Sequence, residues 1–136
     1  MTIRLLSHRV KVSFFTRACD MYLNFTDCLF LNVWTPLNVT TNLPVFFWIH
    51  GGAFKYGSGN IYDGSWWVKV AQESKVPILV VTFNYRLGAL GYMGDAMFAA
   101  ENGKTVGNFG MLDQLVAFKW VKNNIAYFGR FSHFTM

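Results

Sequence analysis

A glycine-rich turn directly after an apolar run is the part of this sequence with the clearest chemical meaning. The run over residues 45–49 is typical of a buried strand, and it leads into His50, Gly51, Gly52 and Ala53. Such small residues leave the backbone open, so that successive N–H groups can point at one position. Converging N–H groups stabilise the negative oxygen that forms during acyl transfer, and the turn is therefore predicted to form an oxyanion hole.

The segments around this turn alternate between strand and helix patterns. Strands are predicted from β-branched and aromatic residues at residues 29–35, 45–49 and 78–83. Ser65 is expected to cap a helix over residues 66–73, a short helix is expected at residues 95–101, and a long helix begins at Phe109. Alternating strands and helices predict the α/β fold class.

Apolar residues in these segments predict which surfaces are buried. The strand over residues 45–49 is apolar throughout and is expected to be buried on both faces. The tryptophans are expected mainly in the core: Trp34, Trp48, Trp66, Trp67 and Trp120. In the long helix, a core-facing stripe at helical spacing is predicted to contain Met111, Leu112, Leu115, Val116, Val121 and Ile125, with Phe118 at its edge.

The composition excludes several classes of function. Charged residues make up 14% of the chain and apolar residues 53%, whereas a typical soluble domain is about 25% charged, so the chain is expected to be an interior piece of a larger protein. The net charge of +5 comes from scattered basic residues, which argues against nucleic-acid binding. No apolar run is long enough for a transmembrane segment, and no cluster of metal ligands appears, so no cofactor or metal is expected.

The chain resembles the type-B carboxylesterases, an α/β-hydrolase family that includes the cholinesterases, in five motifs and in their order along the sequence. The resemblance is carried by DCLFLNVWTP (27–36), LPVFFWIHGGAF (43–54), YDG (62–64), VVTFNYRLGALGY (80–92) and GNFGMLDQLVAFKWVKNNIAYFG (107–129). It implies that residues 19–136 are the N-terminal part of a carboxylesterase domain. It also implies an incomplete α/β-hydrolase fold with a central, mostly parallel sheet and flanking helices. Residues 1–18 remain unassigned.

The resemblance implies roles for the residues of the turn. Gly52 and Ala53 would donate the two oxyanion N–H groups, and Gly51 would be the glycine that permits the turn. His50 does not occupy the position of the catalytic histidine of the family, and a packing or loop-shaping role is expected for it. Phe54 follows the turn and is expected to face the acyl pocket.

Three further residues are expected to have structural roles. Arg86 and Asp113 lie in apolar segments, where a charge needs a partner, and the resemblance implies that they form an ion pair. Two separately solvated charges are the alternative. Cys28 matches a disulfide cysteine of the family, but the family's partner lies further upstream than Cys19, so the pairing of Cys19 with Cys28 stays open.

The sequence contains no G-x-S-x-G motif, the elbow that carries the nucleophile in this family. We therefore expect a fragment of a serine esterase that supplies the oxyanion hole without the Ser/acid/His triad and is inactive as this chain. Its full-length parent would act on a small-molecule carboxylic ester. One alternative is a non-catalytic, neuroligin-like binding module of the same fold, and another is an unrelated α/β domain with a chance glycine turn.

Signals for cellular location point in different directions. Two N-glycosylation sequons begin at Asn24 and Asn38, and together with two cysteines they indicate a secreted parent glycoprotein with a disulfide. Residues 1–18 contain no apolar stretch of the length that a secretory signal needs. The compartment and the oligomeric state therefore stay unassigned at this stage.

Overall fold

Five strands form one mixed sheet in the computed structural model, which describes residues 11–12, 27–37, 42–95, 107–128 and 131–135. In the order β1-β2-β4-β3-β5, the strands are β1 (Lys11–Val12), β2 (Leu31–Trp34), β4 (Leu79–Phe83), β3 (Leu43–Trp48) and β5 (Phe131–Thr135). β2 runs antiparallel to β1 and β4, whereas β3 runs parallel to β4 and β5. The three predicted strands are confirmed, with small differences at their ends.

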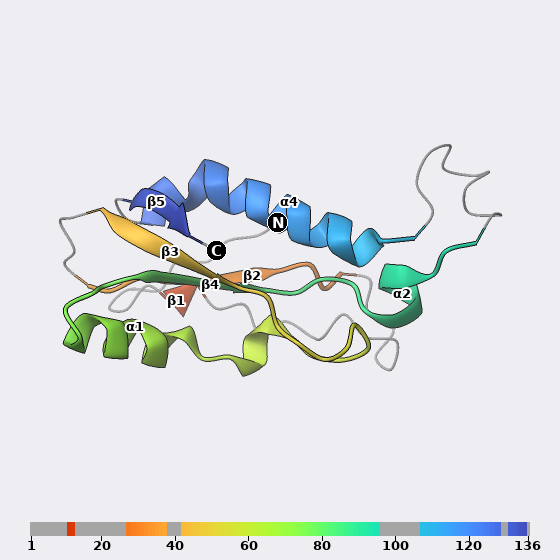
Figure 1. Cartoon of the computed structure of the whole chain (residues 1–136), viewed down its shortest axis with the longest axis horizontal. Coiled ribbons are helices and arrows are strands. Elements are labelled where there is room, and N and C mark those ends of the chain that lie inside the picture. The colour runs from red at the N-terminus through yellow and green to blue at the C-terminus, as the bar shows by residue number, and fades with distance from the viewer. Residues whose placement is uncertain (1–10, 13–26, 38–41, 96–106, 129–130, 136) are drawn as a thin grey trace.

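Helices cover both faces of this sheet. α1 (Gly64–Glu73) lies on one face and α4 (Phe109–Asn124) on the other, while the short α2 (Gly88–Tyr92) lies at the end of the sheet (Figure 1). Two 3-10 turns, η1 (Gly59–Ile61) and η2 (Ile125–Phe128), precede α1 and follow α4. No helix in the described part of the chain has both the length and the apolar character that crossing a membrane requires.

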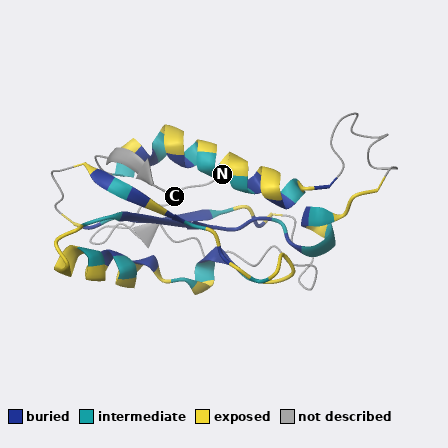
Figure 2. Ribbon diagram, viewed as in Figure 1, coloured by how far each residue is buried: buried dark blue, intermediate teal, exposed yellow. Residues whose placement is uncertain are grey.

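The core lies on both sides of β4, whose five residues are all buried (Figure 2). Because side chains alternate along a strand, Leu79, Val81 and Phe83 pack toward α4, and Val80 packs toward α1. Val121 and Ile125 complete the cluster on the α4 side. The strand at the centre of the sheet is therefore fixed by packing from both helical layers.

Burial on the α1 side is less complete than the sequence predicts. Phe46 of β3 is 40% exposed and Ile49, just after β3, is 43% exposed, so the strand region is not buried on both faces. α1 packs mainly over β4 and β2, and Phe46 is partly covered by an edge-on contact with Trp67. Trp66 lies on the outer side of α1 at 63% exposure, so the prediction that it belongs to the core is wrong.

The long helix packs on the sheet through only part of the predicted stripe, of which Val121 and Ile125 are buried as expected. Its buried residues are Gly110, Asp113 and Val121, followed directly by Ile125, and these positions recur at helical spacing. Four residues assigned to the core are instead exposed by 40–65%: Met111, Leu112, Leu115 and Val116. Two apolar stripes run along the helix, and the sheet packs against the stripe that contains the small Gly110 and the ion-paired Asp113.

The start of α1 also differs from the prediction. Asp63, not Ser65, is the N-cap residue, because its Oδ1 accepts hydrogen bonds from the backbone N–H of Ser65 at 3.0 Å and from the Ser65 hydroxyl at 2.7 Å. The helix α2 was not predicted by the sequence analysis. Most of the short helix expected at residues 95–101 lies outside the described residues.

Matched valine-to-alanine variants of α4 test which stripe of the helix is buried. Val121 is fully buried and Val116 is 65% exposed, so Val121→Ala is expected to lower the free energy of unfolding by about 2 kcal/mol and Val116→Ala by under about 0.5 kcal/mol. Both changes have the same effect on helix propensity. Urea unfolding of the whole chain gives both values, and equal losses would contradict the assignment of the buried face.

Candidate oxyanion hole

The glycine-rich turn lies at the edge of the sheet where β3 and β4 both end (Figure 1). Because these two strands are parallel, the residues after β3 and the residues after β4 leave the sheet side by side. His50 follows β3, and Asn84 and Tyr85 follow β4. Crevices at the carboxyl ends of parallel strands are the usual place for ligand sites in α/β sheets.

The backbone of the turn adopts left-handed conformations at three successive residues. The φ angles are 127° at Gly52, 52° at Ala53 and 61° at Phe54. A Cβ on Gly52 would overlap the carbonyl oxygen of Tyr56, so only glycine fits there. Left-handed backbone costs about 1–2 kcal/mol at a residue other than glycine, so the turn at Ala53 and Phe54 is strained.

Gly51 does not carry the role that the sequence analysis assigned to it. It has no left-handed φ, and a Cβ at this position would meet no atom within 4 Å. The demand for glycine lies one residue later, at Gly52. A repeated glycine pair in a sequence does not show which member takes the unusual conformation, and only the backbone geometry separates them.

Two successive N–H groups of the turn are left without an acceptor. Within the described ranges, no hydrogen bond is formed by the N–H of Gly52 or of Ala53. The Gly52 carbonyl accepts from Lys55 N–H at 2.9 Å and from Tyr56 N–H at 3.2 Å. Because C=O and N–H point in opposite directions across a trans peptide, this pairing turns the Ala53 N–H outward. The two expected donors therefore remain available to an anionic oxygen.

Tyr85 and α2 hold the start and the middle of the turn. The Tyr85 hydroxyl donates to the His50 carbonyl at 2.8 Å, and the two rings stack with their centroids 4.5 Å apart. Gly88 N–H, at the start of α2, donates to the Phe54 carbonyl at 2.7 Å. The Phe54 ring is 52% exposed and contacts Tyr92 at 4.9 Å between centroids. Its expected place in an acyl pocket stays a prediction.

A buried polar network holds the end of the turn. Asn84 Oδ1 accepts from the Ser58 hydroxyl at 3.1 Å and from Gly59 N–H at 2.8 Å, while Asn84 Nδ2 donates to the Cys28 carbonyl at 3.1 Å. The Thr82 hydroxyl donates to the Gly59 carbonyl at 2.9 Å. Buried polar groups need such partners, and here the partners attach η1 to β4 and to the segment before β2.

His50 is directed into the protein. Its side chain is 2% exposed, its Nδ1 lies 2.9 Å from the Gly51 carbonyl oxygen, and its Nε2 is buried without a hydrogen-bond partner. Burial lowers the pKa of His50 below its ordinary value, and the hydrogen bond to Gly51 opposes part of that shift. A ring without access to solvent or to the exposed side of the turn is not placed to act as a general base.

The expected ion pair between Arg86 and Asp113 is present. Arg86 Nε and Nη2 donate to the two carboxylate oxygens at 2.8 Å and 2.7 Å, and the Arg86 backbone N–H adds a third hydrogen bond at 3.0 Å. The side-chain hydrogen bonds to Asp113 raise the pKa of Arg86, whose guanidinium also lies over the Phe109 ring at 5.3 Å. The pair joins the segment after β4 to α4 near the start of that helix.

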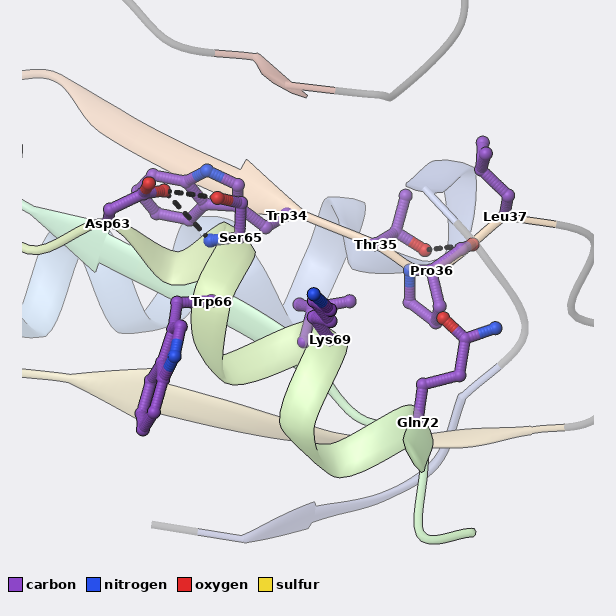
Figure 3. Close-up of a pocket in the computed structure, with 10 residues that line it drawn as sticks. Trp34, Thr35, Pro36, Leu37, Asp63, Ser65, Trp66, Lys69 and Gln72 are labelled. Atoms are coloured by element: carbon purple, nitrogen blue, oxygen red, sulfur yellow. Dashed lines mark hydrogen bonds between the residues drawn. The ribbon is translucent and has the colours of Figure 1, made fainter. Parts of the chain in front are cut away.

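Two cavities in the structure lie away from the turn. The first is about 610 Å³ and is formed where α1 faces the segment after β2, with Trp34, Pro36, Trp66 and Lys69 among its lining residues (Figure 3). The second, of about 550 Å³, lies beside Asp27 and Asp113. Among the residues with described positions, no group of three or more His, Cys, Asp and Glu side chains is arranged to hold a metal ion.

Comparison with known proteins decides the family. A model of the carboxylesterase family matches residues 10–130. This chain belongs to that family. The match begins inside the N-terminal segment that the sequence analysis left unassigned. The structure has the incomplete α/β-hydrolase fold that the motifs predicted. Its sheet was expected to be mostly parallel, but among the described strands two of the four pairings are antiparallel.

Named carboxylesterase relatives match the same part of the chain. The sequence is 49% identical to fumonisin B1 esterase of Sphingopyxis macrogoltabida and 48% identical to para-nitrobenzyl esterase of Bacillus subtilis (strain 168), in each case over 76% of this chain. A thermophilic pNB esterase structure gives a TM-score of 0.64 at 45% identity, and EstA of Aspergillus niger gives 0.64 at 42%, again over 76% of this chain. The chain covers 19–20% of each of these four proteins.

The polar residues that support the carboxylesterase turn were missed by the sequence analysis. Thr82 interrupts the otherwise apolar strand β4, and Asn84 follows that strand. Asn32 interrupts the apolar pattern of β2. Asn32 Nδ2 donates to the Thr82 hydroxyl and to Asn60 Oδ1, each at 3.1 Å. A polar residue inside an apolar strand pattern was the available signal, because such a residue must find a buried partner.

The buried imidazole of His50 predicts a pH dependence of stability. Its pKa is lowered in the folded state, so below about pH 6.5 the unfolded chain binds a proton more readily than the folded chain. The free energy of unfolding is therefore expected to fall as the pH drops below about 6.5 and to be fully retained above it. Urea unfolding between about pH 5.5 and 7.5 measures this dependence.

His50→Phe is the matched control, because His8 and His133 remain in both proteins and their contributions cancel in the difference. The variant is expected to have a flatter pH profile than the unmodified chain in this range. Identical profiles would show that His50 does not titrate differently in the two states.

Proposed function

We propose that this chain supplies the oxyanion-hole segment of a carboxylic ester hydrolase that acts through a serine acyl-enzyme. The observation that carries the proposal is the pair of unpaired N–H groups at Gly52 and Ala53, in a chain that belongs to the carboxylesterase family. When a nucleophile attacks an ester, the carbonyl oxygen gains negative charge. Two backbone donors stabilise that charge more in the transition state than in the ester, which lowers the barrier.

We further propose that the 136 residues alone do not hydrolyse esters. The sequence contains no G-x-S-x-G, and an oxyanion hole without a nucleophile binds a carbonyl oxygen but forms no acyl-enzyme. The substrate of the complete enzyme is proposed to be a small carboxylic ester. The half-exposed Phe54 supports an apolar surface next to the hole, where an acyl group would lie.

A grafted esterase tests the proposal. Residues 27–129 replace the matching segment of the para-nitrobenzyl esterase of Bacillus subtilis, which is 48% identical over 105 residues. The graft is expected to hydrolyse p-nitrophenyl acetate with a kcat within about tenfold of the parent, because the donors keep their geometry. In the graft, Gly52→Ala is expected to lower kcat by about 100-fold or more, since its Cβ would overlap Tyr56.

Gly51→Ala is the matched control for the graft. The same methyl group is added one residue earlier, where it meets no atom within 4 Å, so the loss of kcat is expected to be smaller than for Gly52→Ala. Circular dichroism and thermal melting establish that each protein is folded. A folded graft without esterase activity would favour a non-catalytic, neuroligin-like module and would overturn the proposed function.

We also propose a disulfide between Cys19 and Cys28 in a secreted glycoprotein with sugars on Asn24 and Asn38. The support is that Cys28 is 1% exposed and is not a free cysteine. Cys19 lies outside the described residues. Peptide mapping by mass spectrometry without reduction is expected to find the two peptides joined. Recovery of both cysteines as alkylated free thiols would contradict the pairing.

A further inference from the structure

We propose that His50 is a positioning residue that turns the Gly51–Gly52 peptide so that the Gly52 N–H faces the reacting oxygen. The catalytic consequence rests on the proposed function, whereas the arrangement itself is a property of this chain. The backbone conformation of the turn does not by itself require a histidine at position 50. What the histidine adds is one contact, between its side chain and the carbonyl of Gly51.

That contact determines which ring nitrogen carries the proton. His50 Nδ1 lies 2.9 Å from the carbonyl oxygen of Gly51, and a carbonyl oxygen only accepts hydrogen bonds. The proton therefore resides on Nδ1. With the proton on Nε2, two lone pairs would face each other across 2.9 Å, and the N–H would be buried without an acceptor, since Nε2 has no partner in the structure.

The hydrogen bond also determines the direction of the next N–H group. It holds the Gly51 carbonyl on the inner side of the turn, next to Gly57. A Cβ added to Gly57 would lie 2.6 Å from both the Gly51 oxygen and His50 Nδ1. In a trans peptide the N–H points away from the C=O. The Gly52 N–H is therefore directed to the opposite, outer side of the turn.

Three other carbonyls of the turn, those of His50, Gly52 and Phe54, have their own donors. Tyr85 hydroxyl pairs with the carbonyl of His50, Lys55 and Tyr56 N–H groups pair with that of Gly52, and Gly88 N–H pairs with that of Phe54. Among the described residues, the Gly51 carbonyl receives a hydrogen bond from the His50 side chain and from no other group. Without Nδ1–H, no hydrogen bond from the described residues would fix the orientation of this carbonyl.

The imidazole itself is held by its neighbours. Its ring stacks on Tyr85 with an interplanar angle of 21°, and Gly57 lies so near Nδ1 that a Cβ added to Gly57 would come within 2.6 Å of it. A ring fixed in this way presents Nδ1 to the Gly51 carbonyl with little freedom. Preorganised donors are the form of stabilisation that an oxyanion hole requires.

Nuclear magnetic resonance of the whole 136-residue chain tests the arrangement directly. Long-range ¹H–¹⁵N correlation spectra of the histidine rings at pH 7.5 are expected to show a neutral His50 with its proton on Nδ1. The His50→Asn variant assigns the signal by its disappearance. A proton on Nε2, or a charged ring at this pH, would overturn the inference whatever the catalytic experiments show.

Kinetics of the grafted esterase test the catalytic consequence. His50→Leu removes the donor, and His50→Gln places an amide near the Nε2 position. Both are expected to lower kcat by about 10- to 100-fold with KM changed by less than about twofold, since the donor acts on the transition state. His50→Asn keeps a donor near the Nδ1 position and is expected to recover most of kcat.

A transition-state analogue separates positioning from general destabilisation. A trifluoromethyl ketone forms an anionic hemiketal with the serine, so its inhibition constant is expected to rise by the same factor as kcat/KM falls in His50→Leu. The inference fails if His50→Leu keeps the kcat of the graft, or if His50→Asn loses as much as His50→Leu. An inactive graft with an intact His50 would instead overturn the proposed function, and the proton position would still be decided by the spectra.

Discussion

The parallel pairing of β3 and β4 is the constraint on which the rest of the site depends. It brings the residue that follows one strand, His50, next to the residues that follow the other, Asn84 and Tyr85. From there, hydrogen bonds reach both ends of the turn between residues 50 and 59. Each such bond stabilises the folded state by about 1 kcal/mol, similar to the cost of one left-handed residue in the turn. The strained backbone persists because its surroundings hold it from several directions.

The ion pair between Arg86 and Asp113 extends this support to the helical layer. Arg86 follows Tyr85 directly and Asp113 lies near the start of α4, so the segment that holds the turn is itself held by a helix. A bidentate pair fixes direction as well as distance. Removing Arg86 alone would destabilise the folded state more than removing both charges. The buried Asp113 carboxylate would then remain charged without a partner.

The predictions from sequence succeeded where one residue pattern has one structural meaning. Apolar runs predicted the strands. Charges in apolar segments indicated that Arg86 and Asp113 each need a partner, and the family resemblance implied that they pair with each other. The long helix does not meet this condition, because it has apolar residues on more than one side. The apolar pattern predicted that Met111 and Leu115 face the core, whereas Gly110 does. Buried polar residues such as Thr82 were missed because their partners are brought together only by the sheet.

The hydrogen bonds that hold the turn connect residues far apart in the sequence. Tyr85 comes 35 residues after His50, and the Asn84 side chain reaches back 56 residues to Cys28. During synthesis, therefore, His50 and the two glycines leave the ribosome well before the residues that shape them. Before β4 pairs with β3, the turn lacks the hydrogen bonds from Asn84 and Tyr85 that hold its strained backbone in the folded state. We therefore expect the site to form late in folding, with the closing of a long loop.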